Sequence, residues 1–274
     1  MTALEYLKDK IRIEYESSFI CNVSAGVIDR VARNWLDDEH CSEERFKQMS
    51  KVLPHAQRIL DMASGCGTFV YYGLLHGYEV EGIDPESWKK KLIELKAREK
   101  DYPVEWGSRF YQGVGEALPF ENDTYDCVSS YQTLEHVQDV KKCLAEMIRV
   151  TRSGGCLHLR FPDYRSTFEG HYQLPWLPYF PRPLAKLYLK ILGRPLAGLD
   201  TLQYVSLPRI KRLLKELDSE GKGLEVVDYA ETLYEQALKR KGLPKIPYFI
   251  YKSFLFLKYF GRAELSVNLF VHIS

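Results

Sequence analysis

The stretch from Arg58 to Glu86 constrains the fold more than any other part of the sequence. It contains an apolar run that ends in Asp61, a turn of small residues, a segment of helical character, and a second apolar run that ends in Asp84. This order predicts a strand, a helix and a parallel strand. Small residues let the backbone approach a ligand closely, and an acid about 20 residues further on can bind ribose hydroxyls. We therefore expect a site for a nucleoside-bearing ligand here.

Alternating strand and helix patterns continue to residue 161 and predict an α/β fold with a doubly wound sheet. The predicted strands of this part are 58–62, 79–83, 109–113, 125–130 and 156–161, and the predicted helices are 86–100 and 139–150. Two further strands, near 224–229 and 264–273, have no full crossover helix between them. They predict a mostly parallel sheet of about seven strands with an antiparallel edge strand.

The chain divides into four predicted regions. They are an N-terminal helical cap at 1–56, a core at 57–161, an insertion at 162–206 that is rich in aromatic residues and proline, and a completion of the core at 207–274 with a helical insertion at about 231–261. The first helix, which carries Tyr6, Tyr15 and Phe19, either packs on the sheet or covers the ligand as a lid.

The composition and net charge limit the classes of partner that the protein is expected to bind. A formal net charge of +1 gives no global field for nucleic acid, so we expect a small-molecule partner. The six cysteines include no C-x-x-C pair and are expected to be reduced, and no spacing of ligand residues predicts a metal site. The N-terminal segment carries charges throughout and lacks the apolar core of a signal peptide, so we expect a cytoplasmic protein.

The segment 246–260 is the most apolar of the chain. It is too short to span a bilayer, which takes about 20 residues. One interpretation is a cover helix packed on the 162–206 insertion. The other is a surface that meets a lipid or a lipid-linked substrate, which would place the protein at the periphery of a membrane. The sequence leaves both open.

Five segments between Leu60 and Pro162 carry a family resemblance: LDMASGCG, EGIDPE, GVGEALPFENDTYDCV, QTLEHV and RVTRSGGCLHLRFP. Their order and spacing resemble the class I S-adenosylmethionine-dependent methyltransferases. In detail, these segments are most similar to the branch that acts on small molecules and has a Leu-Glu-His-Val signature, which lies here at 134–137. The resemblance implies a Rossmann-like fold, S-adenosylmethionine as cofactor, and methyl transfer to a small molecule. It covers the core and not the flanking regions, where such enzymes determine their substrate.

By this resemblance, Asp61 and the backbone of Ala63, Gly65 and Gly67 would hold the methionine end of the cofactor. Asp84 would accept hydrogen bonds from both ribose hydroxyls, which suits a carboxylate with two acceptor oxygens. The first glycine of the family is replaced here by Ala63. That replacement is tolerated if the position has a negative φ.

The adenine segment departs from the family, which usually has Gly-Asp-Ala-Glu where this chain has GVGE at 113–116. Val114 has no side-chain acceptor for the adenine amino group. We expect adenine to be held by a set of neighbouring groups: the backbone of Val114 and Gly115, the rings of Pro85 or Trp88, and the carboxylate of Glu116.

Methyl transfer requires a positioned nucleophile and, for a hydroxyl, removal of its proton. His136 follows the fourth predicted strand, at the sheet edge where the methyl group should point, and is the first candidate base. The alternative is that Glu135 and His136 cap the next helix and shape the pocket. His171, beside Tyr172 in the insertion, is the second candidate base.

Three further residues have expected roles outside proton transfer. Tyr131 and Gln132 are expected to line the methyl pocket near the cofactor, and His158 is expected to be structural.

The aromatic insertion suggests a substrate with apolar or sugar surface, because aromatic rings pack on both. We therefore expect O-methylation of a sugar, a lipid-linked glycan or a natural-product hydroxyl. The alternatives are N- or C-methylation of a small molecule and a non-catalytic subunit that binds S-adenosylmethionine. A nicotinamide-dependent oxidoreductase is disfavoured, because the turn lacks the G-x-G-x-x-G spacing.

Overall fold

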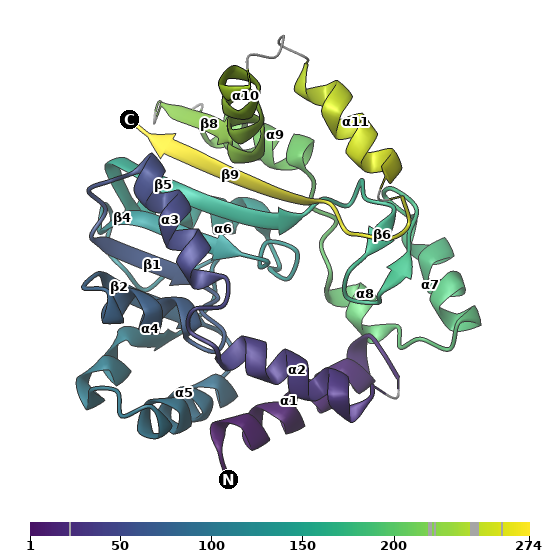
Figure 1. Ribbon diagram of the computed structural model, residues 1–274, viewed down its shortest axis with the longest axis horizontal. Helices are drawn as coiled ribbons and strands as arrows, with labels where there is room; N and C mark the ends of the chain where they lie inside the picture. Colours follow the sequence, from purple (N-terminus) through teal and green to yellow (C-terminus); the bar gives the residue numbers. More distant parts are fainter. Residues whose placement is uncertain (22, 219–220, 222, 242–246, 259) are drawn as a thin grey trace.

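A computed structural model describes residues 1–21, 23–218, 221, 223–241, 247–258 and 260–274 (Figure 1). The helices in this part are α1 (Ala3–Ser18), α2 (Ala25–Leu36), α3 (Ser42–Val52), α4 (Thr68–Leu75), α5 (Trp88–Glu99), the 3-10 helix η1 (Val104–Arg109), α6 (Val140–Val150), α7 (Arg182–Ile191), α8 (Ala197–Thr201), α9 (Leu207–Asp218), α10 (Tyr229–Arg240) and α11 (Tyr248–Lys258). The strands are β1 (Arg58–Met62), β2 (Glu79–Asp84), β3 (Phe110–Gln112), β4 (Tyr125–Tyr131), β5 (Thr151–Pro162), β6 (Phe168–Glu169), β7 (Leu174–Pro175), β8 (Leu224–Asp228) and β9 (Ser266–Ile273).

The main sheet has seven strands in the order β3-β2-β1-β4-β5-β9-β8. The first five are parallel, and β9 lies antiparallel between β5 and β8. The predicted fold class is confirmed, with one difference of detail: the antiparallel strand is β9, one position in from the edge, and the edge is β8. β8 pairs with β9 from Leu224 to Asp228 and is the last strand in the order, so it forms the edge of the sheet.

The predicted strands agree with the observed ones to within two residues, except β5. β5 begins at Thr151, which pairs with Tyr125, and then bulges before Cys156 pairs with Cys127. The sequence pattern predicts this strand only from residue 156, so its first five residues are missed. A side chain at Gly155 would lie 2.6 Å from the Asp126 carbonyl oxygen, so the bulge requires a glycine.

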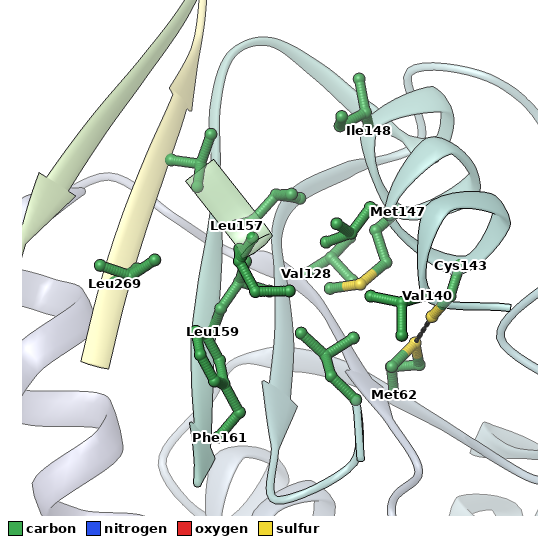
Figure 2. Close-up of a cluster of buried hydrophobic side chains, with 14 of the residues drawn as sticks. Met62, Val128, Val140, Cys143, Met147, Ile148, Leu157, Leu159, Phe161 and Leu269 are labelled. Atoms are coloured by element: carbon green, nitrogen blue, oxygen red, sulfur yellow. Dashed lines mark hydrogen bonds between the residues drawn. The ribbon is translucent and has the colours of Figure 1, made fainter. Parts of the chain in front are cut away.

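Two apolar layers cover the faces of the sheet. On one face, α6 and α9 pack on β4, β5 and β9 through residues such as Leu144, Met147 and Ile210. Figure 2 shows this cluster, in which Cys143 of α6 points at Met62 of β1 with a sulfur-to-sulfur distance of 3.3 Å. On the other face, α3, α4 and α10 pack on the same strands. The central strands are buried on both faces, as a parallel sheet requires.

The two flanking regions have cores of their own. Helices α1 and α2 pack on each other and on α5. The insertion closes around an aromatic cluster that contains Tyr172, Trp176 and Phe180 and that receives Phe19 from the end of α1. The insertion is therefore joined to the N-terminal helices, and Figure 1 shows α8 beside them.

All six cysteines lie in the described part and are free. Among the described residues, no helix is long and apolar enough to cross a membrane.

Asp139 caps α6, the helix that carries much of the core. Its carboxylate accepts hydrogen bonds from the backbone of Lys141 and Lys142 at 3.0 and 3.1 Å. Asp139→Ala should lower the free energy of unfolding by about 1 kcal/mol, because two backbone N–H groups at the start of α6 lose their acceptor. Urea denaturation measures this change. Asp139→Asn is the control and should retain most of the stability. Equal loss in both variants would contradict the capping role.

Candidate functional site

A cavity of about 1160 Å³ lies at the carboxyl ends of β1, β2 and β4. Its walls come from α1, α2, the loops after these strands, and the insertion. Of the residues that the sequence selected, the cavity brings together Ala63, Asp84, Pro85, Val114, Gly115, Glu116, Tyr131, Gln132, His136 and His171. Asp61, Gly65 and Gly67 are not among its lining residues.

Asp61 is buried and engaged by the protein. Its carboxylate accepts a hydrogen bond at 2.5 Å from the guanidinium of Arg45 in α3, which also donates to Ser129 at 2.7 Å. Burial raises the pKa of Asp61, and the Arg45 charge opposes that shift. Asp61 is therefore paired with Arg45 and does not line the cavity, and its contact with the cofactor stays a prediction.

The turn after β1 is fixed by backbone geometry. Ala63 has a φ of 59°, in the left-handed region, so the negative φ that would make the replacement free of strain is not present. Alanine tolerates this conformation at a cost of about 1–2 kcal/mol. Gly67 has a φ of 71° and begins α4, and a side chain there would meet the Phe110 ring at 2.9 Å. Gly65 donates its backbone N–H to Asp84 at 3.0 Å.

Asp84 lies at the end of β2, beside this turn, and its carboxylate already has three donors. They are the backbone N–H groups of Gly65 and Glu86 and the ammonium group of Lys89, each at 3.0 Å. A carboxylate has about four lone-pair positions. Asp84 can therefore accept one ribose hydroxyl as it stands, and a second if Lys89 moves to Glu86, its other partner at 2.7 Å.

The expected adenine end lies beside Asp84. Val114 lines the cavity and is 43% exposed, and its carbonyl oxygen accepts the backbone N–H of Ala117 at 3.2 Å. Gly115 admits no side chain, because a Cβ would lie 2.8 Å from both Cys143 Sγ and Met62 Sδ. Glu116 accepts the backbone N–H groups of Gln138 and Asp139 at 2.7 and 3.1 Å. Its observed role is to hold the loop before α6.

Tyr131 and Gln132 line the cavity where β4 ends. The Tyr131 ring lies between the guanidinium groups of Arg45 and Arg160, at 5.0 and 4.8 Å from the ring centroid. Gln132 has a φ of 53°, which turns the chain out of the strand. This sharp turn brings the next residues of the Leu-Glu-His-Val segment to the cavity.

His136 and His171 meet in this cavity. Their Nε2 atoms lie 3.1 Å apart, and their rings are nearly perpendicular. Nδ1 of His171 lies 2.8 Å from Glu169 Oε1, and Glu169 is buried and also accepts the Tyr172 backbone N–H at 2.6 Å. The structure thus joins the two candidate bases into one chain of contacts, Glu169 to His171 to His136.

Burial and nearby charges shift the pKa values of His136 and His171 in opposite directions. Surrounding protein atoms and the His171 charge lower the pKa of His136, although the side chain itself is exposed to the cavity. Burial alone would lower the pKa of His171, but the bond to Glu169 and neighbouring carboxylates outweigh it and raise the pKa. Burial raises the pKa of Glu135 to about 8.

Two residues near the site are structural. His158 is buried, lies 3.0 Å from Asn268 Oδ1 and stacks on Phe270, as expected. Tyr172 is buried away from the cavity and donates to the Ser18 carbonyl at 3.3 Å, so it is not an acceptor-site residue.

The aromatic residues of the insertion do not line the cavity. Trp176 and Phe180 point into the core of the insertion itself, and the insertion contributes Gly170, His171, Gln173 and Arg194 to the cavity wall. The aromatic surface comes from elsewhere, namely Tyr15, Phe19, Trp35, Trp88 and Tyr131. Our reason for an apolar or sugar substrate was therefore wrong, although an aromatic wall is present.

Sequence reasoning missed three residues that organise the site: Arg45, Lys89 and Glu169. Arg45 lies in an ordinary amphipathic helix, and Lys89 belongs to a lysine run at 89–91, a pattern typical of a solvated helix face. Glu169 stands two residues before His171, and this spacing was the one signal that could have identified it.

Residues 60–159 match the family model described as Methyltransferase domain. The chain is similar to the demethylmenaquinone methyltransferase of Renibacterium salmoninarum, with 28% identity over 178 residues that cover 65% of this chain and 68% of that protein. It is also 29% identical over 126 residues to an uncharacterized methyltransferase of Mycobacterium sp. strain JLS, covering 46% of this chain and 47% of that one. The chain thus spans about half the length of the first mycobacterial relatives it matches.

A solved structure supports the fold. The phosphoethanolamine N-methyltransferase 2 of Haemonchus contortus, in complex with S-adenosyl-L-methionine, superposes with a TM-score of 0.51 and 18% identity over 85% of this chain and 52% of that one. At this identity the likeness concerns the fold alone.

Proposed function

We propose that this chain, whose residues 60–159 form a class I S-adenosylmethionine-dependent methyltransferase domain, transfers a methyl group to a hydroxyl of a small molecule. The observation that carries the proposal is the cavity, because Asp84, other expected cofactor residues and the two histidines line the same space. Its volume of about 1160 Å³ exceeds that of a usual single-ligand pocket, so it has room for a cofactor and an acceptor.

The residues present fit S-adenosylmethionine. Asp84 lines the cavity and has three donors, which leaves one acceptor position for a ribose hydroxyl, and Val114 lines the same cavity for adenine. The left-handed turn at Ala63 presents the backbone to the methionine end. When bound, the cofactor supplies a methyl group on a sulfonium that is an excellent leaving group.

On the acceptor side, the protein positions the hydroxyl and removes its proton. His136 and His171 lie in the same cavity as Tyr131 and Gln132, which follow β4 at the expected methyl position. We propose that the histidine pair takes the proton, because imidazole is the side chain best suited to this transfer near neutral pH. Glu169 orients His171 and compensates a positive charge on it.

The aromatic wall supports an acceptor with apolar or sugar surface, since Tyr15, Phe19 and Trp35 all face the cavity. We therefore propose a sugar, a lipid-linked glycan or a natural product as the acceptor.

Isothermal titration with S-adenosylmethionine and S-adenosylhomocysteine tests the cofactor part of the proposal. We expect both to bind with dissociation constants below about 1 mM. Absence of binding would contradict the proposed function. Binding without turnover on a broad panel of alcohols, amines and carbon acids would favour a non-catalytic subunit instead.

We further propose that α11 contacts a membrane surface or a lipid-linked substrate. Part of the segment 246–260 lies outside the described residues, but Ile250 and Leu257 are 49% and 71% exposed. Leu257→Ser should weaken binding to anionic lipid vesicles by roughly 10-fold, from the lost apolar transfer energy of one leucine. Co-sedimentation measures this, with Ile13→Ser on exposed α1 as the matched control. Equal binding of the two variants and the unchanged protein would contradict the contact.

A further inference from the structure

Glu135, His136 and His171 each offer one ligand atom, and these atoms all lie within 4.8 Å of one another. We propose that the three side chains bind a divalent transition-metal ion, represented by Zn²⁺. Glu135 and His136 come from the loop after β4, and His171 comes from the turn between β6 and β7. Spacing along the chain excluded a metal site, because it does not detect ligands that the insertion brings together across 35 positions.

Glu135 is the first reason for this site. Its side chain is fully buried, and neither carboxylate oxygen has a hydrogen-bond partner in the structure. A buried carboxylate without a partner is costly, so native proteins pair it with a cation or a donor. The neighbouring carboxylates of Glu169 and Glu264 make the position still more attractive for a cation.

The distance between the histidines is the second reason. Two nitrogens that bind one ion at about 2.0–2.1 Å, with a bond angle of about 90–109°, lie roughly 2.9–3.4 Å apart. The two Nε2 atoms lie 3.1 Å apart, inside that interval. Both nitrogens can therefore bind one ion with little movement of the rings.

Glu169 is the third reason, because it supports His171 from behind. Metal-binding histidines usually donate their other ring N–H to a carboxylate, which fixes the ring and makes it a stronger ligand. Nδ1 of His171 has such a partner in Glu169 at 2.8 Å, and Glu169 is held in turn by the Tyr172 backbone. The Nε2 of His171 is thus left for the ion.

The types of ligand indicate which metal ion the site binds, and the position of the site in the cavity indicates what the ion does. Two imidazoles and one carboxylate suit Zn²⁺ and similar first-row ions, whereas Mg²⁺ prefers oxygen ligands. All three ligands line the cavity, so the open side of the ion faces the acceptor. Resting on the proposed function, we infer that in the metal-bound form the two imidazoles act as ligands and not as bases. The ion makes the acceptor hydroxyl more acidic, and its proton passes to solvent, which selects substrates whose hydroxyl can reach a cation.

Titration of chelator-treated protein with Zn²⁺ and with Mg²⁺ tests this site. Because exposed thiols also bind Zn²⁺, the measurement uses a Cys21→Ser, Cys41→Ser background. We expect one equivalent of Zn²⁺ to bind and Mg²⁺ to bind at least 100-fold more weakly. Glu135→Gln and His171→Ala should each weaken Zn²⁺ binding at least 10-fold, while His55→Ala, on an exposed histidine elsewhere, should not.

Glu169→Gln provides a second variant that leaves all three ligands in place, and it should weaken binding by about 10- to 100-fold. Absorption of bound Co²⁺ reports directly on nitrogen and oxygen ligands and should change in the same variants. Equal Zn²⁺ binding in the background protein and in all ligand variants, or no binding at all, would overturn the proposal. Affinity for S-adenosylhomocysteine, measured in parallel, separates a failure of this site from a failure of the proposed function.

Discussion

Replacing His136 with alanine should lower methyl-transfer turnover by about 100-fold or more and leave the affinity for S-adenosylhomocysteine within about 2-fold. His136 lines the cavity at the end of the cofactor-binding edge and contacts His171, while the residues expected to hold the cofactor keep their own partners. The loss therefore falls on the chemical step. Release of S-adenosylhomocysteine in single-turnover experiments, with an acceptor identified from the panel, measures it.

The matched control for this experiment is His55→Ala, which removes an exposed imidazole outside the cavity. A second comparison uses Glu169→Gln, which should reduce turnover less than His136→Ala because Glu169 acts through His171. A His136→Ala enzyme with normal turnover would assign proton removal to His171 or to no residue of the protein.

Asp84→Ala should weaken cofactor binding by about 2–4 kcal/mol, or roughly 30- to 900-fold, through the loss of charge-assisted hydrogen bonds to ribose. The structure adds a second contribution of the same sign. Asp84 holds the Gly65 backbone N–H and the ammonium of Lys89, so its removal also loosens the turn that presents Ala63. Isothermal titration with S-adenosylhomocysteine gives the change.

Asp9→Asn serves as the control, because Asp9 is an exposed acid on α1 whose side chain is 67% accessible. Melting curves of both variants separate a binding effect from a folding defect. Unchanged affinity in Asp84→Ala would refute the ribose assignment and direct attention to Glu86, the other carboxylate in contact with Lys89.

Much of the sheet was predictable because its signals are local. The residues around Asp61 and Asp84 show a strand, a turn and a helix within one short stretch, and the carboxyl ends of adjacent parallel strands must meet at one edge of the sheet. For that reason the sequence alone could place Asp84, Val114 and His136 near one cavity. No local pattern in the sequence indicates which way the individual side chains of this cavity point.

The insertion at 162–206 shows most clearly what the sequence does not predict. Its aromatic composition suggested a substrate surface, yet Trp176 and Phe180 pack inward, because an insertion of this size must build an apolar core of its own. Composition reports that aromatic rings are present. It does not report whether they face a ligand or one another, since irregular segments have no fixed periodicity from which to infer a face.

The sequence by itself determined the sheet, the edge of the sheet at which the cavity lies and the methyltransferase resemblance, because these follow from periodic patterns and short motifs. Only the tertiary structure shows three contacts. Arg45 forms an ion pair with Asp61, Lys89 forms an ion pair with Asp84, and the side chains of Glu135, His136 and His171 lie close together. The physical reason is that each of these contacts depends on how a helix or an insertion packs back on the sheet. Such packing depends on the whole core, so it cannot be inferred from the sequence spacing of the residues that come into contact.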